Sequence, residues 1–203
     1  MLYNFKPNDI ILGLDTETTG LPNRGIEAKD PKQARVVQLA LKLITLQGRV
    51  ICQFSTLIMP SGWDEIHPKA QETHGISRED CERYGIEAVK AFAVFQHYAS
   101  LADVIVAHNG DFDETMMLLE ADALGMDMPA NPWHCTMKEA TPICKVPPTP
   151  AMMRAGRRHY KNANLTEALK ILCGKDLEGA HDAMVDVTGC LDVLLALRQR
   201  KAA

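Results

Sequence analysis

The chain has 203 residues, of which 46% are hydrophobic and 24% are charged, and its formal net charge is −4. This length is sufficient for one α/β domain with a full core, and the composition is ordinary for a globular protein. Because acidic residues outnumber basic residues by 26 to 22, the overall charge gives no sign of nucleic-acid binding. A nucleic acid would have to be held by a local basic patch or by metal ions.

The six cysteines stand singly, mostly within apolar segments, and none forms a Cys-x-x-Cys pair. We therefore expect reduced thiols in an intracellular protein and no zinc site. Residues 1–8 are polar and mixed, unlike a signal peptide. No apolar run approaches the roughly 18 residues of a membrane span. The sequence predicts a cytoplasmic protein without a membrane partner.

The first half of the chain is predicted to supply three strands and two helices. Ile10 to Leu14 is an apolar run that suits a strand buried on both faces. Segments 35–45 and 49–59, joined by a turn at Gln47-Gly48, are predicted to form an antiparallel hairpin. Residues 60–86 read as irregular with one short helix at 69–73, and 87–101 has helical spacing.

The second half is predicted to alternate strands and helices. The expected elements are a short buried strand at 104–107, a helix at 112–124 capped by Asp111 and ended by Gly125, a strand at 132–136, an irregular segment at 142–160, and helices at 165–173 and 182–201. A hairpin followed by strand and helix units predicts one α/β domain over residues 1–203, built on a mixed sheet flanked by helices.

The first strand ends in Asp15-Thr16-Glu17, and Gly20 and Pro22 follow. Side chains two residues apart in a strand point to the same side, so Asp15 and Glu17 are expected to project together. Two adjacent carboxylates resist ionising unless a cation lies between them, and oxygen ligands favour Mg²⁺ or Mn²⁺. The alternative, two solvated acids at an exposed strand end, is the simpler explanation of this pattern alone.

Acidic residues recur in two later segments. Asp111, Asp113 and Glu114 follow the strand at 104–107 and open a helix, a usual place for active sites in α/β sheets. Simple helix capping is the alternative explanation. His181 and Asp186 lie at the start of the last helix, where Asp186 is expected at the margin of the buried face. An ordinary loop histidine is the alternative for His181.

Taken in order, LDTETTGL, THGI, VIVAHNGDFD and AHDAMVD resemble the motifs of the DEDD superfamily of 3′–5′ exonucleases. The histidine in the last motif is typical of the DEDDh, or DnaQ-like, branch, which includes proofreading epsilon subunits of DNA polymerase III, RNase T, oligoribonuclease and Trex-type exonucleases. The resemblance covers Ile10 to Leu197. It implies a ribonuclease H-like fold with a mixed five-stranded sheet and an antiparallel hairpin.

The resemblance implies that Asp15, Glu17, Asp113 and Asp186 are the four acids and that His181 is the general base. Asp113 fits better than Asp111 because the family acid directly follows phenylalanine. Two Mg²⁺ or Mn²⁺ ions about 4 Å apart would activate water and neutralise the phosphate. The resemblance suggests that Asp15, Glu17 and Asp186 hold the water-activating ion, while the second ion leans on Asp15, with help from Asp113.

Four further residues are candidates for contacts near the 3′ end of the substrate. His74, in Thr-His-Gly-Ile, matches a family position that approaches the terminal nucleotide, although a surface-turn histidine is the alternative. The backbone amide of Thr18 is expected to contact the same nucleotide, and Leu21 to form part of the base pocket. Asn109 is expected to order the loop that positions Asp113.

The densest basic run is residues 154–161. Arg157 and Arg158 are candidates for gripping backbone phosphates, and Tyr160 for stacking on a base. A solvated cationic loop is the alternative explanation.

The predicted function is a metal-dependent 3′–5′ exonuclease that releases nucleoside monophosphates from single-stranded DNA or DNA 3′ ends, as in DNA repair or proofreading. The alternatives are the same chemistry on RNA, and a catalytically inactive nucleic-acid-binding module. The chain ends a few residues past its last helix, without the extended tail that joins proofreading subunits to their polymerase. A stand-alone nuclease is therefore favoured over a polymerase partner, and monomer and homodimer both stay open.

Overall fold

The structure is a computed structural model that describes the backbone of residues 2–202 and the side chains of residues 2–200. The outer limits of the predicted domain, residues 1 and 203, lie outside this range. Within it, five strands form one sheet: β1 (Ile10–Thr18), β2 (Val36–Thr45), β3 (Val50–Leu57), β4 (Val104–Ala107) and β5 (Trp133–Cys135). Their order is β3-β2-β1-β4-β5, which places β1 at the centre.

The sheet is mixed, as predicted. β1 pairs antiparallel with β2 and β2 pairs antiparallel with β3, which confirms the predicted hairpin. β4 pairs parallel with both β1 and β5. The helices are α1 (Pro68–His74), α2 (Arg78–Tyr84), α3 (Ala88–Ser100), α4 (Gly110–Leu124), α5 (Thr136–Cys144), α6 (Pro150–Arg154), α7 (Leu165–Cys173) and α8 (Ala183–Ala202).

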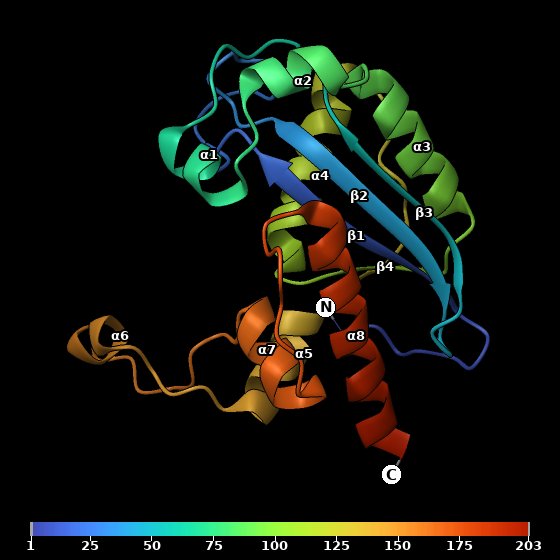
Figure 1. The fold of residues 1–203 in the computed structure, drawn as a ribbon, viewed down its shortest axis with the longest axis vertical. Helices are drawn as coiled ribbons and strands as arrows, with labels where there is room; N and C mark the ends of the chain where they lie inside the picture. The colour runs from blue at the N-terminus through green and yellow to red at the C-terminus, as the bar shows by residue number, and fades with distance from the viewer. Residues whose placement is uncertain (1, 203) are drawn as a thin grey trace.

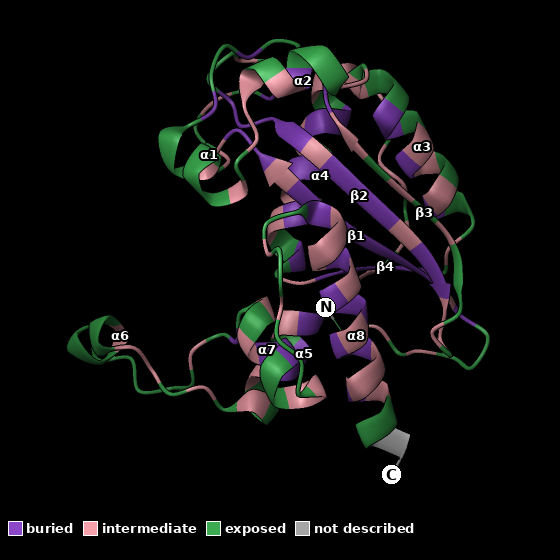
Figure 2. Cartoon of the chain, viewed as in Figure 1, coloured by how far each residue is buried: buried purple, intermediate pink, exposed green. Residues whose placement is uncertain are grey.

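Helices cover the two faces of the sheet (Figure 1), and Figure 2 shows β1 and β2 as largely buried and the edge strand β3 as half-buried or exposed. On one face, Leu12 and Leu14 of β1 pack with Phe95 of α3 and Met116 of α4. On the other face, Ile11 packs against α8. Apolar residues thus alternate along β1 between two cores, which explains why the sequence shows an almost continuous apolar run.

α8 approaches β1 unusually closely at Gly13. A Cβ atom at this position would lie 2.8 Å from Leu191 Cδ1 and 3.0 Å from Val187 Cγ1, both on α8. The start of α8 is also tied to β2, because the Ala183 N–H donates to Gln38 Oε1 at 3.1 Å. These contacts fix the first turns of α8 over the carboxyl end of β1.

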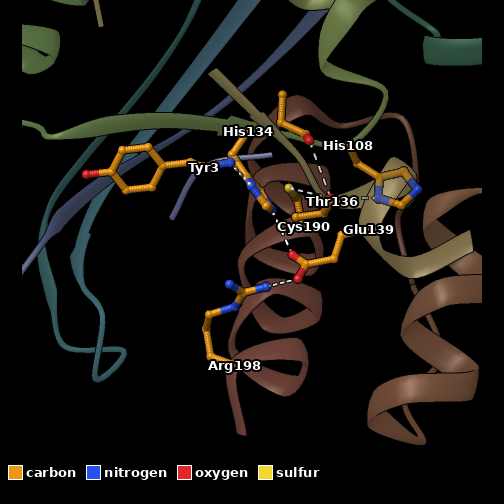
Figure 3. A network of polar contacts seen from close by, with 8 residues as sticks. Tyr3, His108, His134, Thr136, Glu139, Cys190 and Arg198 are labelled. Atoms are coloured by element: carbon orange, nitrogen blue, oxygen red, sulfur yellow. Dashed lines mark hydrogen bonds and ion pairs between the residues drawn. The ribbon is translucent and has the colours of Figure 1, made fainter. Parts of the chain in front are cut away.

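α5 was not predicted, because its inward face is polar. Glu139 of α5 is buried, forms an ion pair with Arg198 of α8, and lies with its Oε2 3.0 Å from His134 Nε2. The N-terminal segment joins this cluster through Tyr3, whose N–H donates to His134 Nδ1 at 3.2 Å. Figure 3 shows this network. A buried charge that is balanced by other side chains is tolerated in a helix, but it does not give the apolar periodicity that sequence patterns detect.

β1 contains Asp15 and Glu17 near its end and stops at Thr18. One further prediction about local structure was wrong. Asp111 does not cap α4: the N-cap is Asn109, in the left-handed conformation with φ 70°, and Asp111 lies in the first turn. Asp111 instead forms an exposed ion pair with Lys138 at 2.6 Å.

Among residues 2–202, no helix is long and apolar enough to cross a membrane.

Candidate active site

The site is built around the carboxyl-terminal half of β1. Ile11 and Gly13 face α8, so strand alternation places Asp15 and Glu17 on the same side as α8. β2 pairs with β1 from Ile10 to Thr18, whereas β4 pairs with it only from Ile11 to Gly13. The edge of β1 beyond Leu14 is therefore left without a strand on the β4 side.

Asp113 of α4 occupies this edge. Its Oδ1 accepts hydrogen bonds from the backbone N–H of Thr16 at 3.1 Å and from the Thr16 hydroxyl at 2.9 Å. Asp113 is 3% exposed, so both bonds are shielded from water. The left-handed conformation of Asn109 turns the chain from β4 directly into α4, which brings Asp113 to β1. The carboxylate thus takes the place of a missing strand partner.

The last two predicted residues come from the turn before α8 and from the first turn of α8. His181 has a left-handed backbone (φ 71°), and its N–H donates to Asp186 Oδ2 at 3.3 Å. Glu17, His181 and Asp186 each offer one possible metal-ligand atom, and these atoms all lie within 4.8 Å of one another. Two distant chain segments, the end of β1 and the start of α8, therefore converge on one point.

The clustered carboxylates of the site repel one another when no cation is bound. Burial, with repulsion from Asp113, Asp186 and Glu17, raises the pKa of Asp15 well above its ordinary value. Burial, with repulsion from Asp186 and Asp113, raises the pKa of Glu17 to about 8. Burial also raises the pKa of Asp113 to about 7, although the Thr16 hydrogen bonds oppose this rise. The carboxylates would resist ionising together at neutral pH.

Asp186 gives a further sign that a ligand is needed. Burial raises the pKa of its carboxyl group, while the hydrogen bond from the His181 backbone lowers it. Its Oδ1 is buried and has no hydrogen-bond partner within residues 2–200. A buried, unsatisfied carboxylate oxygen destabilises the fold unless a cation, a water molecule or another donor binds it. The donor set of carboxylate oxygens fits Mg²⁺ or Mn²⁺.

A pocket of about 480 Å³ adjoins the acids, and three predicted substrate residues line it: Thr18, Leu21 and His74. The Ile76 N–H donates to His74 Nδ1 at 3.0 Å, so the proton of the neutral ring lies on Nε2, which donates to the Thr18 carbonyl at 3.2 Å. His74 therefore ties α1 to the end of β1 and fixes one wall of the pocket. Leu21 is 83% exposed, which leaves its side chain accessible to a ligand.

The other predicted substrate residues lie elsewhere. Asn109 shapes the turn before α4 through its backbone, and its side chain makes no capping hydrogen bond there. Arg157, Arg158 and Tyr160 are exposed and lie on residues 145–162, which we call the arm. Figure 1 shows the arm, with α6 at its tip, projecting away from α5 and α7. The structure does not bring these three residues into the acidic cluster.

Several residues of the site were not predicted. Thr16, which holds Asp113, lies between the two predicted acids, where no local pattern distinguishes it from other strand residues. Phe112, His67 and Lys69 line the pocket. Phe112 was detectable, because it directly precedes a predicted acid. His67 and Lys69 reach the pocket only through the tertiary placement of α1, which no local pattern indicates.

Comparisons with known proteins agree with this geometry. Residues 12–194 match the RNase_T family model, described as exonuclease. No curated protein matches the chain. The structure is similar to E. coli exonuclease I in complex with a dA16 oligonucleotide, with a TM-score of 0.75 and 18% identity over 96% of this chain and 42% of that one.

Two other solved structures show the same likeness. The zinc-ion-bound form of an E. coli exonuclease I complex with single-stranded DNA has a TM-score of 0.72 and 16% identity over 96% of this chain and 41% of that one. The nuclease domain of 3′hExo, a DEDDh family member bound to rAMP, has a TM-score of 0.69 and 14% identity over 95% of this chain and 93% of that one. The chain thus spans about two fifths of the exonuclease I chains. The likeness confirms the predicted ribonuclease H-like fold.

Proposed function

Because the chain belongs to the exonuclease family, we propose that it is a metal-dependent exonuclease that removes nucleoside monophosphates from 3′ ends. The observation that carries this proposal is the convergence of carboxylates from β1, α4 and α8 beside an open pocket. Such a cluster is unfavourable for folding, since burial and mutual repulsion raise the pKa of its members. This penalty argues against an inactive binding module, which would gain nothing from it.

In this proposal Asp15, Glu17 and Asp186 hold one Mg²⁺ or Mn²⁺ ion, and Asp15 with Asp113 supports a second. The partnerless Oδ1 of Asp186 supports its assignment as a ligand. When bound, divalent ions supply positive charge to the phosphate and lower the pKa of coordinated water. Asp113 has one oxygen committed to Thr16, which leaves its other oxygen for an ion or a bound water.

His181 is proposed as the general base. Its imidazole lies beside Glu17 and Asp186 and is exposed to solvent, so it can accept a proton from the attacking water and release it to bulk. The hydrogen bond from its backbone N–H to Asp186 fixes the loop relative to the acids. The same geometry would also allow His181 to be a metal ligand, so the two roles need separate measurements.

The pocket lined by Thr18, Leu21 and His74 is proposed to hold the 3′-terminal nucleotide. Leu21 offers an exposed apolar surface for a base, and Lys69 places a positive charge on the same wall. The pocket opens next to Glu17, so a nucleotide seated there presents its phosphate to the acids. Phe112 adds an aromatic surface on the α4 side.

We propose single-stranded DNA as the substrate, with RNA as the second candidate. Solved relatives of this fold carry both kinds of nucleotide, since exonuclease I is bound to dA16 and 3′hExo to rAMP. Discrimination rests on whether the pocket accepts a 2′-hydroxyl group. Direct competition between DNA and RNA strands of the same sequence distinguishes the two.

The decisive experiment uses DNA and RNA strands labelled at either end, with Mg²⁺, Mn²⁺ or a chelator. The proposal expects a ladder of shortened products from 5′-labelled strands, immediate release of labelled mononucleotide from 3′-labelled strands, and no reaction in chelator. Internal cleavage products would contradict exonuclease action. Immediate release of labelled mononucleotide from 5′-labelled strands would contradict the 3′–5′ polarity. Turnover that persists in chelator would contradict metal dependence.

A His181→Ala variant tests the general base. Removing a positioned base lowers turnover by about 10²–10⁴-fold, whereas Mn²⁺ affinity measured by calorimetry should stay within about threefold of the parent if His181 is not a ligand. Exposed Glu72 on α1 provides a control, Glu72→Gln, that should change neither quantity. A His181→Ala variant with the parental rate would show that another group takes the proton.

A further inference from the structure

The arm concentrates positive charge in an otherwise acidic protein. From residue 140 to residue 166 the sequence contains no acidic residue, whereas the net charge of the whole chain is −4. The basic residues of this stretch are Lys145, Arg154, Arg157, Arg158 and Lys161. Like charges grouped on one exposed segment repel one another, so their grouping favours a polyanionic partner.

Most of this charge is available. Lys161 is neutralised by Glu167, at 2.6 Å. Arg154, Arg157 and Arg158 are exposed and pair with no carboxylate within residues 2–200. Tyr160 is also accessible, with 46% of its surface exposed. An aromatic ring beside unpaired arginines is the combination that binds single-stranded nucleic acid through base stacking and phosphate contacts.

The arm is anchored at its base. The Lys161 N–H donates to the Val146 carbonyl at 3.0 Å, which joins the two legs of the arm. The next anchor is Ala163, whose N–H donates to Thr141 Oγ1 at 3.2 Å and whose carbonyl lies 3.0 Å from His108 Nε2. These bonds fix where the arm leaves the body of the protein, although Figure 2 shows the arm itself as largely exposed.

The anchor leads directly to the acidic cluster. His108 immediately precedes Asn109, the residue that turns the chain into α4 and so places Asp113. Its other ring nitrogen, Nδ1, lies 2.9 Å from the Thr136 hydroxyl at the start of α5 (Figure 3). Burial lowers the pKa of His108 to about 4, so the ring is neutral and this connection is unchanged across the neutral range. The base of the arm and the acidic cluster thus share one rigid connection.

We infer that the arm binds backbone phosphates upstream of the 3′ end, so the preferred substrates are polynucleotides and not oligonucleotides of two or three residues. This inference rests on the proposed exonuclease function. The terminal pocket next to Glu17 is lined by residues of β1, α1 and α4 and includes a single lysine, Lys69, so it offers few contacts for phosphates upstream of the terminal nucleotide. A short oligonucleotide engages only this pocket, whereas a longer strand also reaches the arginines of the arm.

The test compares a trinucleotide with a single DNA strand of about 24 nucleotides. The variant Arg157→Ala/Arg158→Ala removes two charges from the arm. The control Lys6→Ala/Arg49→Ala removes two exposed charges from the N-terminal segment and the β2–β3 turn. Binding is measured by fluorescence anisotropy over a salt series, and hydrolysis is measured as kcat/KM for each length. Circular dichroism verifies that both variants are folded.

Loss of two phosphate contacts on a single strand should lower the slope of log affinity against log salt by about 1.4. At 0.1 M salt this corresponds to about 25-fold weaker binding of the long strand. The trinucleotide should keep its kcat/KM, and the control should behave like the parent. Unchanged affinity for the long strand, or equal losses for both lengths, would overturn the inference. If neither length is hydrolysed with Mg²⁺ or Mn²⁺, the proposed nuclease activity fails, whereas the binding series still decides the role of the arm.

Discussion

Neutralising Glu17 should make the metal-free protein more stable, and more so at high pH. The pKa of Glu17 rises from its ordinary value of 4.5 to about 8 in the fold. Because the unfolded chain releases this proton at lower pH than the folded chain does, stability is lost as pH rises from about 4.5 to about 8. Glu17→Gln removes the ionisable group and keeps the shape of the side chain.

The size of the effect follows from the same pKa. The rise from 4.5 to about 8 corresponds to at most about 5 kcal/mol. Since Glu17 is partly exposed, solvent screening reduces this figure to about 2 kcal/mol at pH 8. At pH 5, close to the ordinary pKa, the gain should fall below about 0.5 kcal/mol. In a chain of 203 residues, about 2 kcal/mol raises Tm by about 4–8 °C.

The assay is thermal unfolding at both pH values, in chelator and again with Mn²⁺. In chelator, Glu17→Gln should unfold at a higher temperature than the parent at pH 8 and near the parental temperature at pH 5. Added Mn²⁺ should stabilise the parent and have little effect on the variant, because a metal that binds only the folded state raises stability by mass action. An exposed control, Glu72→Gln, should leave Tm unchanged. An equal gain at both pH values would refute the reasoning, because the charge of Glu17 would then not be its source.

Two further substitutions test how the scaffold holds the site. Glu120→Ala leaves buried Arg35 without its carboxylate partner, now 2.6 Å away, and should lower the free energy of unfolding by about 3–5 kcal/mol in urea titrations. As a control, Glu82→Ala breaks the exposed ion pair with Arg78 and should change the free energy of unfolding by less than about 1 kcal/mol. Similar losses in both variants would contradict the role assigned to the buried pair. Gly13→Ala forces a methyl group against α8 and should lower stability by about 1–3 kcal/mol; an unchanged Tm would show that α8 can shift away from β1.

Much of this fold was predictable because its core strands follow simple patterns. The strand at 104–107 and the helix at 165–173 have the predicted limits. α2 was missed because only Cys81 of its residues is buried, so it has no apolar stripe. The capping box formed by Ser77 and Asp80 was nevertheless a local signal for this helix.

The sequence was sufficient to propose the residues of the candidate site, but it did not indicate how the fold holds them together. The spacing of Asp15 and Glu17 indicates one strand face, and the later acids follow from motif order. The hydrogen bonds from Thr16 to Asp113 join residues 97 positions apart, and no local pattern encodes such a pairing. Likewise, the ion pair between Asp111 and Lys138 depends on where α5 lies, so the sequence suggested a helix cap instead.

The position of the acids within a strand has a consequence for ion binding. Acids on a flexible loop relieve their repulsion by swinging apart, and an empty loop site therefore opens. β1 has no such freedom, because its hydrogen bonds to β2 run from Ile10 to Thr18. Asp15 and Glu17 are therefore held close together by the backbone of β1, and binding an ion would require little further conformational ordering of these residues. Under the proposed function, the stiffness of the central strand would lower the entropic cost of binding a cation.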